Sequence, residues 1–392
     1  MSNTFHQNLA QTTPYPFGIK VDHAKGSYLY DKDGNSYIDL ISGIGVSVLG
    51  HGNQAVINAI KNQVDKHLHV MVYGEFEQDA QNSLAEELKR TLPSQLHSFY
   101  FLNSGTEANE AAMKLAKRVT GRSKFISFKG SYHGNSQGSM SISDNEWRKM
   151  PFRPLIPGVS FIRLNHEEDL SAITKEVAGV FLETIQGDAG VRIPEKSFMK
   201  ALRGRCNEVG ALLIFDEIQS GVGRTGKMWA FEHFDVVPDI MTAGKALGGG
   251  MPIGCMASSK ENMLLLSHQP ILGHITTFGG HPVVCAAGAA ALKYIREENL
   301  LAASKDKAAL FMKLLKHPKI KAIRQIGLMF AIELESEEVV KQVVLEGLKK
   351  GLLLFWFLST PYAFRLAPPL TISEDEIKTA LKILLELIDQ TK

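Results

Sequence analysis

The sequence predicts an α/β protein in which a large domain with a mostly parallel sheet carries a second, smaller α+β domain. Three observations lead to this fold class. Short apolar runs alternate with helical patterns from about residue 52 to 295, as in strands joined by crossover helices. After residue 285, helices with only a few strands replace this alternation. N-terminal to the alternating region, residues 26–43 are predicted to form a hairpin, with tyrosines and aliphatic residues flanking an Asp-Gly turn.

Six apolar runs are the predicted strands of the large sheet. They are "HSFYFLNSG", "KFISFKG", "VSFIRL", "VAGVFLETI", "ALLIFDEI" and "DIMTAG". Helical patterns cover 105–120, 195–209, 283–298 and 374–390. We therefore expect residues 51–284 to form the large domain. Residues 285–392 would form the small domain, which residues 1–50 join.

The composition limits the classes of function. The net charge is +2 and the basic residues are spread along the chain, which argues against a nucleic-acid partner or a membrane-surface segment. The longest apolar run, 352–358, is too short to span a bilayer, and the N-terminus has no apolar run of a signal peptide. Three widely spaced cysteines form neither a disulfide framework nor a metal site. We expect a cytoplasmic protein without a metal ion.

The stretch "GVGRTGK" at 221–227 resembles two nucleotide-binding motifs. As a P-loop it lacks the hydroxyl that binds Mg²⁺, because Met228 follows Lys227. As a dinucleotide fingerprint starting at Gly221, it lacks a helix that opens on the glycines. The next acidic residues, Asp235 and Asp239, also come too early. The glycines are therefore interpreted as a loop.

Asp216 and Lys245 are the two strand-end residues with the strongest chemical meaning. Asp216 directly follows the buried run "ALLIF", and the carboxyl end of such a strand is where α/β proteins bind ligands. Lys245 follows the strand "DIMTA" between Gly244 and Ala246. A lysine that small residues direct into a site loses its proton more readily and can form a Schiff base. A turn-capping Asp and a surface Lys are the plainer interpretations.

Two further stretches complete a ligand description. In "NSGTEANEAAMKLAKRV", Ser104, Gly105 and Thr106 open a helix directly after a strand, which makes a phosphate site or simply a helix cap. Tyr132 follows another strand and could stack on a flat ring. A phosphate, a reactive aldehyde, a flat ring and a basic ring nitrogen together describe pyridoxal phosphate.

With these motifs the sequence resembles the class III aminotransferases, a family of fold-type I pyridoxal-phosphate-dependent transferases. This family includes acetylornithine, ornithine and 4-aminobutyrate aminotransferases. The resemblance runs nearly end to end, through "NSGTEANEAAMKLAKR", "YHG", "ETIQGDAGV", "LLIFDEIQSGVGRTGK", "AGKALGGGMPIG", "TTFGGHP" and "RLAPPLTIS".

The resemblance implies roles for the cofactor residues. Lys245 would hold pyridoxal phosphate as a Schiff base, Asp216 would pair with the ring nitrogen, and Gln219 would contact the ring oxygen. The other cofactor contacts would come from Ser104, Gly105, Thr106, Tyr132 and Thr277. Thr277 would reach the phosphate of a neighbouring subunit, so the resemblance implies a homodimer with shared active sites.

The resemblance also implies a substrate-binding set. Its members are Asn135, Glu183, Asp188, Thr276 and Arg365. Arg365 would bind a substrate carboxylate, gated by the acid at 188. Two of the five depart from the family: Asn135 replaces an arginine that holds a substrate carboxylate, and Asp188 is one methylene shorter than the usual glutamate. Its reach to Arg365 is therefore an open question.

The implied reaction moves an amino group from a terminal-amine donor, such as acetylornithine, ornithine or 4-aminobutyrate, to a 2-oxo acid such as 2-oxoglutarate. Because of Asn135, either 2-oxoglutarate binds weakly and pyruvate deserves a test, or another basic residue has taken over. The sequence alone does not place Arg148 or Arg153 there. A decarboxylase, aminomutase or racemase of the same family would share every cofactor residue. The alternative from another class is a nucleotide-binding protein that uses Gly221 to Lys227.

Overall fold

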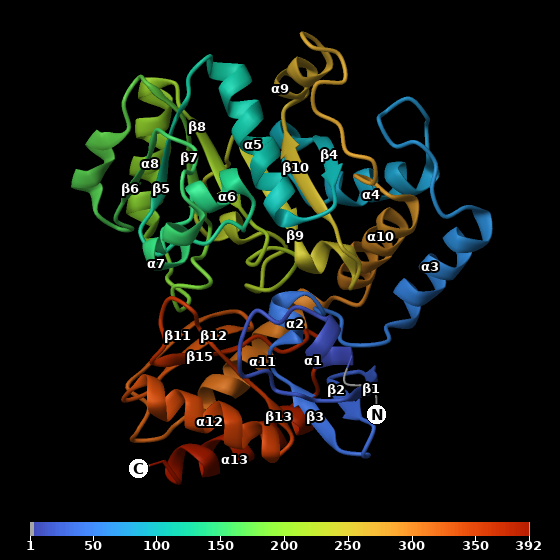
Figure 1. The fold of residues 1–392 in the computed structure, drawn as a ribbon, viewed down its shortest axis with the longest axis vertical. Coiled ribbons are helices and arrows are strands. Elements are labelled where there is room, and N and C mark those ends of the chain that lie inside the picture. Colours follow the sequence, from blue (N-terminus) through green and yellow to red (C-terminus); the bar gives the residue numbers. More distant parts are fainter. Residues whose placement is uncertain (1–3, 392) are drawn as a thin grey trace.

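The computed structural model describes residues 4–391 as two domains, one above the other in Figure 1. The large domain is built on a seven-stranded sheet. Its strands, in spatial order, are β4 (Ser98–Leu102), β10 (Gly254–Ser258), β9 (Ile240–Gly244), β8 (Leu212–Asp216), β7 (Val177–Glu183), β5 (Lys124–Phe128) and β6 (Val159–Ile162). β10 is antiparallel to both of its neighbours, and the other pairings are parallel. The predicted α/β class with a mostly parallel sheet is confirmed.

The large-domain helices follow local signals in the sequence. The longer ones are α3 (Gln54–Lys66), α4 (Asp79–Lys89), α5 (Gly105–Thr120), α8 (Lys196–Val209) and α10 (Pro282–Glu297), and the short ones are α6 (Gln137–Ser141), α7 (Glu146–Lys149) and α9 (Lys260–Leu264). In α5, the Ser104 hydroxyl accepts a hydrogen bond from the Glu107 N–H, and Gly121 ends the helix at φ 68°. Both are standard helix-end devices. Alanines on one face let α5 pack closely on β9 and β10.

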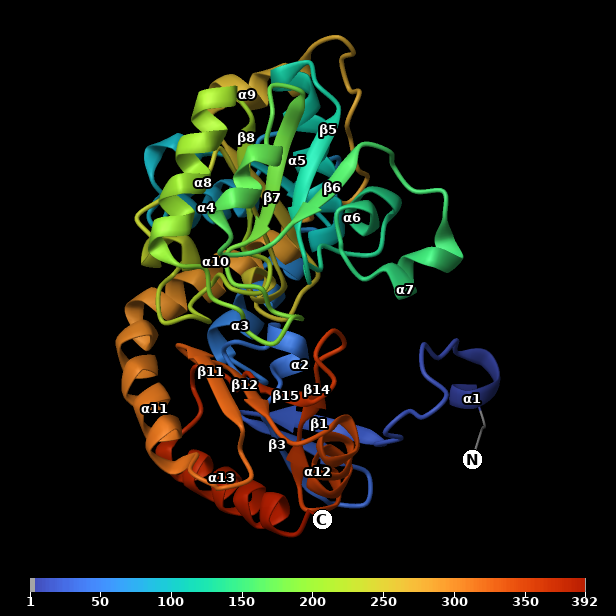
Figure 2. The ribbon, with the colours of Figure 1, turned by 90° about the vertical axis from the view of Figure 1, so that its left-hand side faces the viewer.

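The small domain combines both ends of the chain. The hairpin strands β2 (Tyr28–Asp31) and β3 (Ser36–Asp39) lie in one sheet with β1 (Val21–Lys25) and β13 (Leu352–Leu353). A second sheet contains β11 (Ala322–Ile326), β12 (Met329–Glu333), β15 (Ala363–Leu366) and β14 (Phe355–Trp356). Figure 2 shows α11 (Leu300–Leu314) and α13 (Glu374–Asp389) along the outer edge, near α12 (Glu337–Lys349). Two short helices, α1 (Thr4–Asn8) and α2 (Ser42–Gly45), precede α3.

The division at 284–285 stays a prediction. That position falls inside α10, which packs against α3 and α4 of the large domain. Among residues 4–391, no helix combines the length and the apolar character needed to cross a bilayer. The same residues hold no group of three or more His, Cys, Asp and Glu side chains arranged to bind a metal ion.

The loop 221–227 joins the two domains. Arg224 is 1% exposed and donates hydrogen bonds to the carbonyls of Leu328 (3.0 Å) and Pro368 (2.6 Å). A Cβ on Gly327 would lie 2.2 Å from the Thr225 carbonyl carbon, so only glycine allows this close approach. Backbone N–H groups within the loop are bonded internally, for example Gly226 N–H to the Gly223 carbonyl. The loop therefore connects the two domains. Because its backbone N–H groups are used in internal hydrogen bonds, few of them remain to bind a nucleotide phosphate.

Candidate active site

A cavity of about 280 Å³ opens where β7, β8 and β9 end and α5 begins. Of the residues predicted for the site, it is lined by Gly105, Thr106, Tyr132, Asn135, Glu183, Asp216, Gln219 and Lys245. His133, Gly134, Ile185, Ile218 and Ser220 complete the lining. Residues more than a hundred positions apart thus meet at the carboxyl edge of the sheet, where α/β proteins bind ligands.

Lys245 projects into this cavity from the end of β9. Its backbone is in the left-handed region at φ 45°, an uncommon conformation for a non-glycine residue that is often found at functional sites. Protein surrounds the amine, and this burial lowers the pKa of Lys245, although the charges of Asp216 and Glu183 oppose the effect. A lysine with a lowered pKa supplies more neutral amine, the form that attacks a carbonyl carbon.

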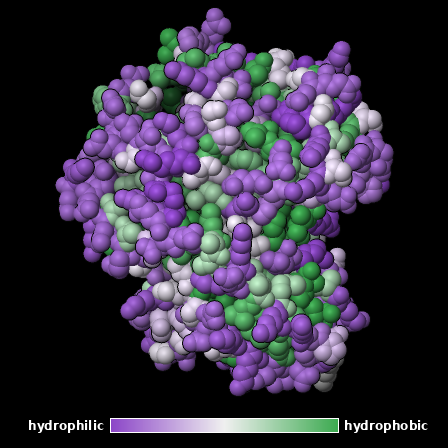
Figure 3. All heavy atoms as spheres, turned by 180° about the vertical axis from the view of Figure 1, so that it is seen from behind, coloured by the Kyte–Doolittle hydropathy of each residue, from purple (hydrophilic) through white to green (hydrophobic). Residues whose placement is uncertain are grey.

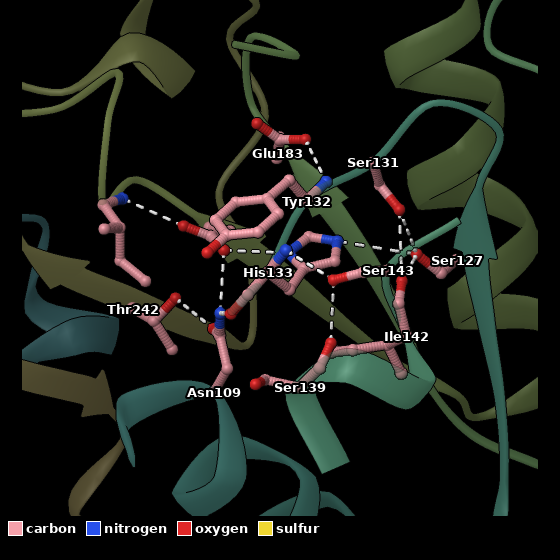
Figure 4. Close-up of polar contacts among 12 residues, drawn as sticks. Asn109, Ser127, Ser131, Tyr132, His133, Ser139, Ile142, Ser143, Glu183 and Thr242 are labelled. Carbon is pink, nitrogen blue, oxygen red and sulfur yellow. Dashed lines mark hydrogen bonds and ion pairs between the residues drawn. The ribbon is translucent and has the colours of Figure 1, made fainter. Parts of the chain in front are cut away.

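Asp216, at the end of β8, is held by three donors (Figure 4). Its Oδ2 accepts hydrogen bonds from Asn109 Nδ2 and His133 Nδ1, both at 2.8 Å, and its Oδ1 accepts one from the Ile218 N–H at 3.0 Å. The carboxylate is 5% exposed. A buried carboxylate that accepts from three donors has a fixed orientation.

Asn109 and His133 are functional candidates that sequence reasoning missed. Asn109 is fully buried and uses its whole amide. Its nitrogen donates to Asp216 and to the His133 carbonyl, and its oxygen accepts from the Thr242 hydroxyl at 2.8 Å. Asn109 is four residues after Gly105, so both residues lie on the same face of α5. This spacing is the sequence feature that could have indicated a place for Asn109 at the site. His133 directly follows Tyr132.

The N-terminus of α5 forms the opposite wall. N–H groups in the first turn of a helix have no acceptor within the helix, so those of Gly105 and Thr106 face the cavity with the positive end of the helix dipole. A Cβ on Gly105 would lie 2.7 Å from Ile218 Cδ1, so any side chain there would require Ile218 to shift. The Thr106 hydroxyl is within 2.7 Å of the Ser136 hydroxyl. Ser104 caps the helix from outside the cavity lining.

Glu183 connects two loops of the site. Its Oε1 accepts from the Tyr132 N–H at 2.8 Å and its Oε2 from the Gly187 N–H at 2.9 Å. Burial raises the pKa of Glu183 to about 7, with the Asp216 charge adding to the rise. Tyr132 is 37% exposed. Its ring lies beside His133 in Figure 4, so the loop that Glu183 holds presents an aromatic face to the cavity.

Arg365 and Asp188 form an ion pair next to Glu183. Arg365 Nη2 lies 3.4 Å from Asp188 Oδ1, so the shorter acid does reach the arginine. Asp188 is also held by the Ser359 hydroxyl (2.8 Å) and the Leu358 N–H (3.2 Å). Arg365 stacks on the Phe357 ring at 4.4 Å, and its buried Nε has no hydrogen-bond partner in the described chain. A buried guanidinium with one long ion-pair contact and a free N–H is available to an incoming carboxylate.

Three of the predicted site residues are either exposed to solvent or lie outside the cavity that contains Lys245. Asn135 lines the cavity with an exposed side chain. Thr276 borders a separate cavity of about 660 Å³ along β4, and Thr277 is exposed nearby. Neither threonine meets Lys245 within one chain.

The cavity fits the chemistry of pyridoxal phosphate. It combines a buried amine without a hydrogen-bond partner in the described chain, a fixed carboxylate, an aromatic face and a helix N-terminus with free N–H groups. Lys245 would hold the aldehyde carbon, Asp216 the ring nitrogen, Tyr132 the ring face, and Gly105 with Thr106 the phosphate. Each of these pairings matches an electronic need of the cofactor.

Comparison with known proteins gives the same family. The model of the family described as "Aminotransferase class-III" matches residues 10–388. An acetylornithine aminotransferase of Methanopyrus kandleri is 40% identical, over 93% of this chain and 93% of the relative. A LysW-aminoadipate semialdehyde/glutamate semialdehyde transaminase of Sulfurisphaera tokodaii is 38% identical, over 88% of this chain and 90% of the relative.

Solved structures agree. The ornithine aminotransferase of Toxoplasma gondii, described with pyridoxal phosphate at its active site, superposes with a TM-score of 0.90 at 29% identity. The match covers 98% of this chain and 92% of that one. Sequence motifs, cavity chemistry and relatives thus agree on the reaction class and the cofactor. The chain belongs to the class III aminotransferases, and it is a pyridoxal-phosphate-dependent transaminase.

Proposed function

We propose that this enzyme transfers an amino group between a terminal-amine compound and a 2-oxo acid, with 2-oxoglutarate as the first acceptor to test and pyruvate as the second. One observation carries the proposal. Lys245 and the fixed carboxylate of Asp216 line one cavity, and the guanidinium of Arg365 lies close enough for its charge to act on Lys245. The activities for which the two relatives are named support the donor class. Acetylornithine has a terminal amine, and amino transfer to a semialdehyde produces one.

Lys245 and Asp216 have different proposed roles in the reaction. When bound, pyridoxal phosphate supplies a carbonyl carbon for the donor amine and an electron-withdrawing ring. Lys245, whose pKa is lowered by burial, would take a proton from the amine-bearing carbon of the substrate and return it to the cofactor carbon. Asp216, oriented by its three donors, would face the ring nitrogen and favour the protonated ring.

Arg365 would orient the substrate through its carboxylate. Asp188 occupies this arginine when no carboxylate is present, and the Ser359 hydroxyl and Leu358 N–H keep the acid in place. A substrate carboxylate can compete because the existing contact is single and long, whereas an arginine–carboxylate pair can be bidentate. Gln219 would contact the ring oxygen, and Glu183 would hold the Tyr132 loop.

A homodimer in the cytoplasm is part of the proposal. Thr277 and its neighbour Phe278, which is 54% exposed, lie on the surface away from the cavity. A second copy that covers this region would bring Thr277 to the phosphate of its partner. Figure 3 shows polar residues over much of the back of the molecule, with apolar residues gathered around its middle and in the lower domain.

The test is an amine-donor screen. The purified protein with pyridoxal phosphate is incubated with N-acetylornithine, ornithine or 4-aminobutyrate, and with either 2-oxoglutarate or pyruvate. We expect glutamate or alanine to form together with an aldehyde from the terminal amine. Transfer from only α-amino groups would refute the donor class. Sedimentation at micromolar concentration tests the dimer.

A further inference from the structure

A substrate with two carboxylates requires two cationic partners, and the cavity described above has one arginine at its side. Arg365 supplies the first guanidinium from the small domain. The lining itself contains no arginine, and Asn135 at the mouth carries no charge. An acceptor such as 2-oxoglutarate therefore needs a cation from just outside the lining. Tyr132, which is 37% exposed, lines the cavity near Asn135.

Two arginines lie on the segment that follows Tyr132, and the structure separates them. Arg153 is exposed and paired with Glu146, its Nε lying 2.8 Å from Glu146 Oε1. Arg148, on α7, is partly buried. Within residues 4–391 its guanidinium has no hydrogen bond and no ion pair. Its backbone N–H alone is bonded, to Asn145 Oδ1. Arg148 is thus a guanidinium free to bind an anion, whereas Arg153 is already neutralised.

Hydrogen bonds fix the segment that precedes α7 to the Tyr132 loop. The Asp144 N–H donates to the Ser131 carbonyl at 3.0 Å, and Asp144 Oδ2 accepts from the Gly130 N–H at 2.8 Å. The Ser143 hydroxyl accepts from the His133 N–H at 2.8 Å. These bonds lie on both sides of Tyr132, so they hold the chain that leads into α7 against the neighbours of Tyr132.

Arg148 is less buried than Lys149. Lys149, the next residue, is 5% exposed, and its Nζ donates to the Ser143 carbonyl at 2.8 Å and lies 4.5 Å from the Phe161 ring centroid. The Arg148 charge is near enough to the Tyr132 phenol to oppose the rise in the pKa of this phenol, a rise caused mainly by burial. This supports the placement that the hydrogen bonds give.

We propose that Arg148 binds the distal carboxylate of a dicarboxylic substrate, with 2-oxoglutarate and glutamate as the substrate class, while Arg365 binds the carboxylate next to the reacting carbon. The inference rests on the proposed function and deepens it by naming the acceptor class. The long arginine side chain on a separate helix takes the place of a guanidinium at position 135. A planar guanidinium suits this task because it can donate two parallel hydrogen bonds to one carboxylate.

The main experiment compares Arg148→Gln with the matched control Arg153→Gln. Both variants lose one positive charge from the same segment, but only Arg148 is free to bind an anion. For Arg148→Gln we expect kcat/KM for 2-oxoglutarate to fall about ten- to a hundredfold, the range for one charge-assisted contact. The efficiency with pyruvate should change less than about threefold. Arg153→Gln should leave both within about twofold. Equal losses for both acceptors, or equal losses in both variants, would overturn the proposal.

A binding measurement does not depend on turnover. Isothermal titration of the holoenzyme with glutarate, a five-carbon diacid, and with butyrate, a monoacid, separates the two carboxylate sites. Arg148→Gln should weaken glutarate about tenfold or more and leave butyrate nearly unchanged. If wild type shows no amino transfer from any terminal amine but glutarate binding still depends on Arg148, the proposed donor is wrong and the arginine assignment survives. If glutarate binds equally well to both proteins, the assignment is wrong.

A rescue variant tests the replacement directly. Asn135→Arg introduced into Arg148→Gln should recover most of the lost efficiency with 2-oxoglutarate, because it returns a guanidinium to the same opening. Arg148→Lys should retain part of it, since an ammonium keeps the charge without the bidentate geometry. Loss of 2-oxoglutarate use that neither variant repairs, in a protein with normal thermal stability, would contradict a carboxylate-binding role.

Discussion

Replacing Asp216 with asparagine removes one negative charge and almost no volume, so it tests the role of the carboxylate with little disturbance of packing. The native carboxylate receives two donors at Oδ2 and one at Oδ1. An asparagine has a single acceptor oxygen. If this oxygen faces Asn109 and His133, its amide hydrogens oppose the Ile218 N–H. In the flipped orientation, the amide hydrogens of the asparagine face two donors, Asn109 Nδ2 and His133 Nδ1.

The magnitude follows from these contacts. One buried donor left unsatisfied costs ~1–3 kcal/mol of folding free energy. Loss of the charge opposite the ring nitrogen corresponds to breaking a buried ion pair, which costs roughly 3–5 kcal/mol. If ~3 kcal/mol of this falls on the transition state, kcat/KM decreases on the order of a hundredfold.

The assay pairs steady-state kinetics of amino transfer with the denaturant midpoint of the apoprotein. Asp239→Asn is the matched control. This acid also accepts a strand N–H (Leu213, 2.7 Å) and an arginine (Arg203, 2.8 Å), but it does not line the cavity. We expect the control to lose stability and keep its kcat/KM. An Asp216→Asn protein with near-normal turnover would show that this carboxylate only shapes the turn.

Three further predictions concern other buried groups of the site. Lys245→Ala should abolish turnover, and borohydride reduction of the wild-type holoenzyme followed by peptide mapping should tag Lys245; a tag on another lysine would contradict the assignment. Asn109→Ala should destabilise the apoprotein by ~2–4 kcal/mol, because it removes one hydrogen bond to a charged group and leaves the Thr242 hydroxyl without its acceptor; an unchanged denaturant midpoint would contradict this. Glu183 has a folded-state pKa of about 7, above its usual value, so its contribution to stability is full below about pH 4.5 and is lost as the pH rises through about 7. Glu183→Gln should therefore flatten the pH dependence of apoprotein stability between about pH 5 and 7, and an unchanged slope would refute the burial argument.

Local signals explain how much of the fold could be predicted. Continuous apolar runs predicted β7 and β8, and a serine cap with a terminal glycine bounded α5. β10 was missed because its sequence, "GCMAS", consists mainly of small residues with weak strand preference. It is held between β4 and β9 by tertiary pairing.

The same logic applies to the site. Asp216 and Lys245 follow strands directly, so their positions could be predicted from sequence order. The role of Asn109 could not be predicted, because a polar residue within a helix can also face solvent. The packing of α5 on β9 turns this side chain inward. Arg148 and Arg153 are equivalent in the sequence; the pairing of Arg153 with Glu146 distinguishes them in space. Thr277 requires a second chain and stays a prediction.

The contact between loop 221–227 and the small domain has a consequence for redesigning substrate scope. At Gly327 any side chain would push the domains apart, and Arg224 has two carbonyl acceptors that no shorter residue would reach. Because this loop follows Asp216 and Gln219 in the chain, substitutions there would disturb the catalytic strand before they altered specificity. A mutant library should therefore hold this loop constant. Diversity belongs in the Tyr132-to-Arg148 segment and in the stretch around Ser359, where the proposed substrate contacts lie.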